Sequence, residues 1–155
     1  MPSLIAIAIT TGILSAVWGW LSVTLGLLTW AGFLGCTSYF ASSDDRLIGL
    51  GASLLANLTG VFWAMTIING SAWLGSAWLG NPYLGYALTG IVAFLMCAQA
   101  QFRWLTYIPG TFIGACATFA AEGDWLLVVP SLVIGGVFGF LMKQSGYGLK
   151  RALTK

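Results

Sequence analysis

The chain has 155 residues, of which 59% are hydrophobic and 6% are charged, with no histidine and a formal net charge of +2. A soluble domain carries about 25% charged residues, so this chain has too little charge to cover a surface that faces water. Its apolar length is enough for several bilayer spans of about 20 residues each, which indicates an integral membrane protein, and its small charge gives no indication of nucleic-acid binding.

Polar residues divide the chain into six apolar segments, and each is expected to be a helix because backbone groups in lipid must bond internally. In chain order they are Leu4–Val23, Leu25–Ala41, Leu47–Ile68, Leu84–Ala100, Trp104–Ala121 and Trp125–Met142. The first segment has no basic region before it and is longer than a signal-peptide core, so it predicts a retained span. The first boundary is the weakest, because it is marked only by the uncharged stretch Val23-Thr24-Leu25-Gly26.

The connection between the third and fourth segments, Asn69 to Gly85, contains the pentapeptide SAWLG twice in tandem. We interpret it as a loop or short helix on the membrane surface, since its two tryptophans suit the interface. A lid over an entrance is the alternative. Most tryptophans of the chain are expected at headgroup level, as interfacial belts: Trp18, Trp20, Trp30, Trp63, Trp73, Trp78, Trp104 and Trp125.

The basic residues predict the orientation of the chain. With six spans, all of them fall on one side of the membrane, at the second and fourth connections and after the sixth segment: Arg46, Arg103, Lys143, Lys150, Arg151 and Lys155. The positive-inside rule makes that side cytoplasmic. Both termini and a short C-terminal tail are therefore expected in the cytoplasm.

Two stretches of the sequence repeat each other, AGFLGCTSYFASSDD at 31–45 and GTFIGACATFAAEGD at 110–124. At an offset of 79 residues they share five pairs: Phe33/Phe112, Gly35/Gly114, Phe40/Phe119, Ala41/Ala120 and Asp45/Asp124. Shorter matches link the first segment to the fourth (Thr11-Gly12-Ile13 and Thr89-Gly90-Ile91) and the third to the sixth (Gly60 and Gly139).

The repeat predicts an all-α integral membrane protein of six transmembrane helices, arranged as a 3+3 inverted-topology repeat within one membrane domain, 1–155. The halves, about 4–69 and 82–146, each hold three spans. Because three is an odd number, the second half must enter from the opposite side. The alternative is chance similarity, since apolar helices use few residue types.

The residue types needed for catalysis are missing from the predicted spans. There is no histidine and no acidic residue within a span, so general acid–base chemistry, nucleophilic chemistry and proton-coupled pumping lack their usual groups. Cys36, Cys97 and Cys116 lie within apolar runs without CxxC spacing, which indicates packing rather than a disulfide or metal site. We therefore expect no enzymatic activity, no metal and no cofactor.

Neutral polar and aromatic side chains are the remaining candidates for function. We expect the second and fifth segments to border a narrow path for a small neutral or weakly charged solute. The candidate path residues are Phe40, Phe119, Thr37, Ser38, Tyr39, Asn57, Thr111 and Thr118. Phe40 and Phe119 are the candidate constrictions, and Asn57 is the strongest single candidate because a buried amide needs partners.

Candidate helix breaks stand at Gly32 in the second segment and at Pro109-Gly110 in the fifth. For each of these polar, aromatic and glycine positions, ordinary helix packing is the competing interpretation.

The blocks WGWLSVTLGLLTWAGFLGCTSYFA at 18–41 and IPGTFIGACATFAAEGDWLLVVPSL at 108–132 resemble a bacterial family of unknown function, the YcdZ family. The resemblance runs from Ile7 to about Gly146 and implies a small bacterial inner-membrane protein, without a substrate or catalytic residues. We expect a channel or facilitator for a small solute, working as a homo-oligomer because short, glycine-rich helices suit subunit packing. A non-transporting scaffold or regulatory partner is the alternative.

Overall fold

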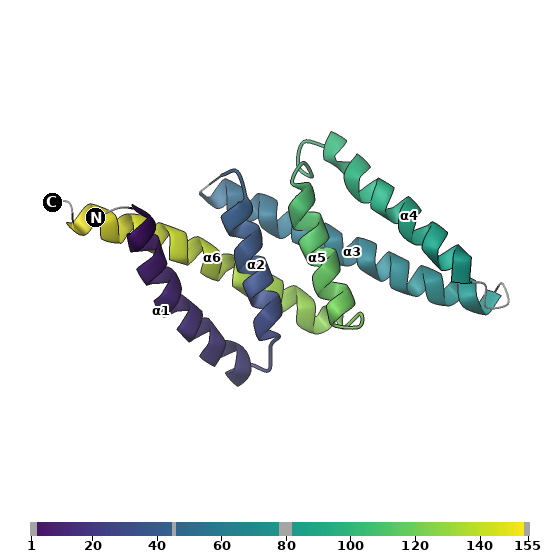
Figure 1. The fold of residues 1–155 in the computed structure, drawn as a ribbon, viewed down its shortest axis with the longest axis horizontal. Helices are drawn as coiled ribbons and strands as arrows, with labels where there is room; N and C mark the ends of the chain where they lie inside the picture. The colour runs from purple at the N-terminus through teal and green to yellow at the C-terminus, as the bar shows by residue number, and fades with distance from the viewer. Residues whose placement is uncertain (1–2, 45, 78–81, 154–155) are drawn as a thin grey trace.

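The computed structural model describes residues 3–44, 46–77 and 82–153, and these form helices joined by short connections (Figure 1). The helices are α1 (Ser3–Thr24), α2 (Thr29–Ala41), α3 (Leu47–Ala77), α4 (Pro82–Ala98), the 3₁₀ turn η1 (Gln99–Gln101), α5 (Ile108–Ala120) and α6 (Trp125–Leu153). The described part of the chain contains no strand, so the predicted all-helical fold with six α-helices is confirmed. The predictions that rest on Asp45, Trp78 and Lys155 lie outside the described residues.

Four helices, α1, α3, α4 and α6, are long and apolar enough to cross a membrane. The other two, α2 and α5, have 13 residues each. At 1.5 Å per residue each is about 20 Å long, which is less than the hydrocarbon core of about 30 Å. The predicted second and fifth spans are therefore shorter as helices than expected, and both lose residues at their N-terminal ends.

The starts of α2 and α5 explain this shortening. Gly26 adopts φ +67°, which turns the chain after α1, so that α2 begins only at Thr29. Helix α5 has Pro109 in its first turn, where the missing backbone N–H removes no helical bond. Pro109 and Gly110 therefore begin a helix rather than break one, and α2 continues unbroken through Gly32.

Helix α3 is longer than expected and corrects the prediction for the third connection. It continues through Asn69 and Gly70 to Ala77, so the first part of the expected surface loop is helical. The reason is packing on α4, because an added Cβ at Gly70 would come within 2.6 Å of the Leu88 side chain. Helix α6 likewise extends beyond Met142, so most of the expected C-terminal tail is helical.

Helices of each half pack mainly on the long helix of the other half. Helices α1 and α2 pack on α6, whereas α4 and α5 pack on α3. Figure 1 shows α1 and α4 at opposite ends of the molecule, with α2 and α5 side by side and crossing α6 and α3. Contacts between α2 and α5 and between α3 and α6 join the two groups.

Glycines bring these crossing helices into backbone contact. A Cβ added at Gly35 of α2 would lie 2.2 Å from the Leu132 carbonyl oxygen of α6. One added at Gly60 of α3 would lie 1.9 Å from the Thr111 carbonyl oxygen of α5. Small residues at helix crossings permit such close approach, which strengthens van der Waals packing where no hydrophobic effect drives association.

Candidate functional site

A cluster of neutral polar side chains lies where α2, α3, η1 and the start of α5 meet, and it consists of two separate hydrogen-bonded groups. We call it the polar cluster, and its members are Ser38, Asn57, Thr59, Trp63, Gln99, Tyr107 and Thr111. Ser38 and Thr111 are fully buried, and Asn57 is 1% exposed. Polar groups this deeply buried need partners, which the cluster largely supplies from different helices.

One branch of the cluster joins α2, α3 and the residue before α5. The hydroxyl of Ser38 donates to Asn57 Oδ1 at 2.8 Å, and the phenol of Tyr107 donates to the backbone carbonyl of Ser38 at 2.9 Å. Tyr107 therefore ties the start of α5 to the end of α2.

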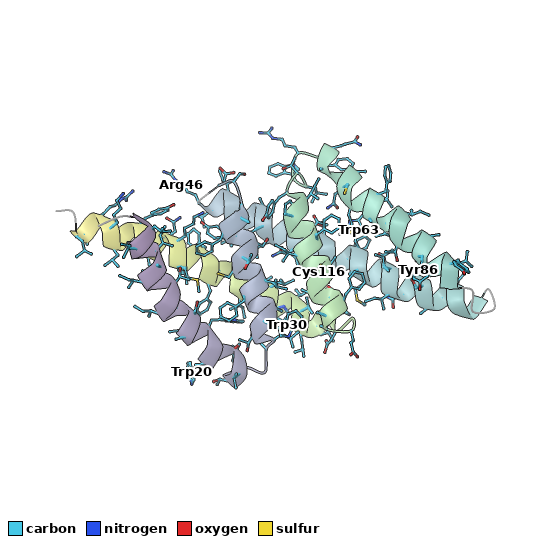
Figure 2. All side chains as sticks on the ribbon, in the orientation of Figure 1. Trp20, Trp30, Arg46, Trp63, Tyr86 and Cys116 are labelled. Atoms are coloured by element: carbon cyan, nitrogen blue, oxygen red, sulfur yellow. The ribbon has the colours of Figure 1, made fainter. Side chains whose placement is uncertain are left out.

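The other branch joins α3, η1 and α5 through Gln99. Its Nε2 donates to Thr111 Oγ1 at 2.8 Å, and its Oε1 accepts from the indole of Trp63 at 2.8 Å. Trp63 lies where α3, α4 and α5 meet (Figure 2). Thr59 donates to the Ala56 carbonyl at 2.8 Å and has its hydroxyl 3.5 Å from that of Thr111.

Asn57 leaves one donor of the cluster unused. Its Oδ1 is bonded to Ser38, but its Nδ2 is buried and has no hydrogen-bond partner among the described residues. Thr11 Oγ1 is the other such atom in the described part of the chain. An unsatisfied buried donor costs about 1–3 kcal/mol, so the amide of Asn57 holds binding capacity that the folded chain does not use.

Of the predicted path residues, Ser38 and Asn57 bond each other, whereas Thr111 belongs to the other hydrogen-bonded group, with Gln99. Thr37 is exposed and donates to the Phe33 carbonyl of its own helix at 2.9 Å. Thr118 is buried but also bonds within its own helix, to Gly114 at 2.9 Å. These last two contacts are those expected of ordinary helix packing.

The aromatic candidates have different surroundings. Tyr39 is fully buried, with its ring centroid 5.8 Å from that of Phe140. The ammonium of Lys143 lies 5.7 Å from the centroid of Phe40, and Phe119 is 43% exposed. Phe40 and Phe119 stand near the ends of α2 and α5, which run in opposite directions in Figure 1.

Four members of the cluster are not among the predicted path residues: Thr59, Trp63, Gln99 and Tyr107. Trp63 was expected in an interfacial belt, and so was Trp18, which is 1% exposed and donates to the Thr29 carbonyl at 3.0 Å. Both indoles bond within the protein, and their depth in the membrane stays a prediction. Exposed indoles do occur at Trp20, Trp73 and Trp104. The one local signal for Tyr107 is its place just before the proline that begins α5.

Most of the chain matches one known protein family. Residues 8–147 match the family described as "Protein of unknown function (DUF1097)". The chain belongs to this family. It is similar to the inner membrane protein YcdZ of Escherichia coli K12, with 59% identity over 155 residues covering 100% of this chain and 93% of that protein. The resemblance expected from Ile7 to about Gly146 is therefore confirmed.

Two further relatives extend the DUF1097 comparison. The inner membrane protein YcdZ of Salmonella typhimurium is 57% identical over 149 residues, covering 96% of this chain and 91% of that protein. The uncharacterized protein YahC of Escherichia coli K12 is 27% identical over 162 residues, covering 100% and 98%. No solved structure matches the chain.

Proposed function

We propose that this DUF1097 protein is a multi-pass inner membrane protein that lets a small neutral or weakly charged solute cross the bilayer. The observation that carries the proposal is the unpartnered Nδ2 of Asn57 within the buried polar cluster. Intramembrane polar groups are costly to bury and usually mark pathways or binding sites. The location is supported by the apolar helices and by the names of the relatives.

The solute's chemistry follows from the donors and acceptors of the cluster. Ser38, Asn57, Gln99 and Thr111 carry hydroxyl and amide groups, and each can donate or accept a hydrogen bond without carrying charge. An amide or a polyol would match such a site, because the free N–H of Asn57 needs a neutral or weakly anionic acceptor. A fully charged ion would have to enter without a counter-charge, which is unfavourable in lipid.

The short length of α2 and α5 supports a solute path between these two helices. Helices α2 and α5 are each about 20 Å long, so the non-helical residues before them lie at membrane depth if both helices are to span. Irregular backbone at that depth is tolerated where protein buries it or where it lines a water-filled cavity. A thin barrier between α2 and α5 would shorten the distance that a solute travels without water.

We infer that the fold is a 3+3 inverted-topology repeat. Its support is the exchange of packing partners: α1 and α2 lie on α6 as α4 and α5 lie on α3. The close contacts also follow the offset of 79 residues. Gly35 approaches Gly136 as Gly114 approaches Asn57. Gly139 approaches Cys36 as Gly60 approaches Ala115.

Burial along the two short helices supports the same inference. The buried positions of α2 from 31 to 39 have buried counterparts 79 residues later in α5, and Phe33 and Thr37 are exposed like Phe112 and Cys116. We further infer that the side carrying Arg46 and Arg103 is cytoplasmic. Both connections that hold these arginines lie along the upper edge of Figure 1, with the start of α1 and the C-terminal end of α6 toward the same edge.

The test is solute flux into proteoliposomes. A panel of urea, glycerol, formamide, formate and acetate is offered to vesicles with and without the purified protein, and shrinking or swelling is followed by light scattering. At least one neutral solute is expected to enter faster than it enters empty vesicles. A panel in which no solute moves faster contradicts the proposal.

The second candidate function is a non-transporting scaffold or regulatory partner. It is favoured by the backbone contacts at Gly35 and Gly60, which close the α2–α6 and α3–α5 crossings. Under this alternative the flux panel stays at the level of empty vesicles.

A further inference from the structure

A cavity of about 430 Å³ opens between the α2–α3 connection and the last turns of α6, away from the polar cluster. It is lined by Arg46, Gln144, Tyr147, Gly148 and Arg151. Arg46 lies at the upper edge of the molecule, at the start of α3 (Figure 2). Both arginines are exposed, so two guanidinium groups border one pocket that also carries an amide and a phenol.

An apolar groove adjoins this cavity. It has a volume of about 390 Å³ and is lined by Arg46, Leu47, Ile48, Phe140 and Gln144. Arg46 and Gln144 line both hollows, so the groove and the cavity are neighbours. Leu47 is 69% exposed and Ile48 is 75% exposed, which leaves an apolar surface beside a cationic one.

We propose that these two hollows bind one anionic phospholipid, with its phosphate between Arg46 and Arg151 and an acyl chain in the groove of Leu47, Ile48 and Phe140. Guanidinium groups bind phosphate through paired N–H donors, and basic pockets at the cytoplasmic ends of membrane helices suit acidic headgroups. The apolar groove is the argument for a lipid over free phosphate, because inorganic phosphate has nothing to place there.

Surrounding charges favour an anion at this place. Lys143 and Lys150 lie on the same end of α6, and Lys143 also stands 5.6 Å from the Tyr39 ring centroid. Two acidic residues directly precede Arg46 in the sequence: Asp44, which is exposed, and Asp45, which lies outside the described residues. This proposal does not depend on solute passage, since its test measures lipid retention and no flux.

The test is native mass spectrometry of the full-length protein in detergent, titrated with phosphatidylglycerol, phosphatidylcholine or inorganic phosphate. Phosphatidylglycerol is expected to bind at least tenfold more tightly than phosphatidylcholine, and inorganic phosphate is not expected to compete at millimolar concentration. Arg46→Gln and Arg151→Gln should each weaken phosphatidylglycerol binding by about fivefold, since a basic residue near an anionic surface contributes roughly that factor. The matched control is Arg103→Gln, an exposed arginine outside the lining of both hollows, which should bind like the wild type.

Three outcomes would overturn the assignment. Equal binding of the two lipids would remove the role of the anionic headgroup. An equal loss in Arg103→Gln would show a diffuse charge effect with no site. Displacement by inorganic phosphate at millimolar concentration would show an anion site that does not use the groove. A variant that loses the helical circular dichroism is replaced by Arg46→Lys, which keeps the charge but loses the paired donors and is expected to bind about threefold more weakly than wild type.

Discussion

Asn57 and Gln99 are two buried amides that differ in how many of their polar atoms have hydrogen-bond partners. Gln99 donates to Thr111 and accepts from Trp63, whereas Asn57 leaves its Nδ2 without a partner. A satisfied amide stabilises the fold through its bonds, and an unsatisfied one carries a desolvation penalty. The first is suited to holding helices together and the second to binding a ligand.

This contrast predicts different effects on stability. Gln99→Leu removes the hydrogen bonds to Thr111 and Trp63 and is expected to lower the free energy of unfolding by about 1–3 kcal/mol. Asn57→Leu removes one bond but also the unsatisfied donor, so its effect is expected to stay within about 1 kcal/mol of wild type. Denaturation in mixed micelles, followed by tryptophan fluorescence, measures both. A loss in Asn57→Leu as large as that in Gln99→Leu would mean that Asn57 is chiefly structural.

A second prediction concerns single glycines at the helix crossings. Gly60→Ala places a Cβ against the Thr111 carbonyl and should destabilise the protein by about 1–3 kcal/mol through overpacking. Gly12→Ala is the matched control, because an added Cβ there meets no atom within 4 Å. The same micelle denaturation compares them. Equal stability of the two variants would contradict the close crossing of α3 and α5.

At the scale of elements, the continuation of α3 to Ala77 is the largest departure from the sequence prediction. Ala72→Pro tests it, because proline inside a helix removes a bond and clashes with the preceding turn, at a cost of about 3 kcal/mol. Ala72→Gly is the control, with an expected cost of about 1 kcal/mol. If the proline variant is as stable as the glycine variant, the segment is a loop.

The helix starts and ends show where sequence reasoning failed. Apolar runs located all six helices, since backbone in lipid must be helical, but composition could not distinguish a helix from apolar irregular chain. Leu25 to Leu28 is apolar, yet it turns at Gly26 and its end is bonded to Ser131, which lies 103 residues away. Asn69-Gly70 is a plausible helix stop, but packing on α4 overrides it.

The candidate site was predictable in part. Ser38, Asn57 and Thr111 could be named because neutral polar groups within apolar runs need partners. Which partners they take depends on how α2, α3 and α5 cross. That information is tertiary, so the roles of Trp63 and Tyr107 did not follow from local pattern.

At the scale of the whole molecule, the inferred orientation predicts which connections are accessible from outside. In a background with all three cysteines replaced by alanine, Glu122→Cys between α5 and α6 should react with a membrane-impermeant maleimide in intact spheroplasts. Ser43→Cys between α2 and α3 should react only after the membrane is opened. The reverse pattern, or labelling of both in intact spheroplasts, would contradict a single orientation with the arginines inside.

The proposed function requires a small neutral solute to pass through the polar cluster on its way across the membrane. Its most direct test compares flux of the fastest solute of the panel in proteoliposomes holding wild type, Asn57→Leu or Ser131→Ala. Ser131 is a buried polar residue that bonds Leu28 and Leu127, outside the polar cluster, and so serves as the control. We expect Asn57→Leu to lower flux about tenfold or more, because it loses a hydrogen bond to the solute of about 1.5 kcal/mol, and Ser131→Ala to retain the wild-type flux. Equal flux through wild type and Asn57→Leu would contradict solute passage at the polar cluster.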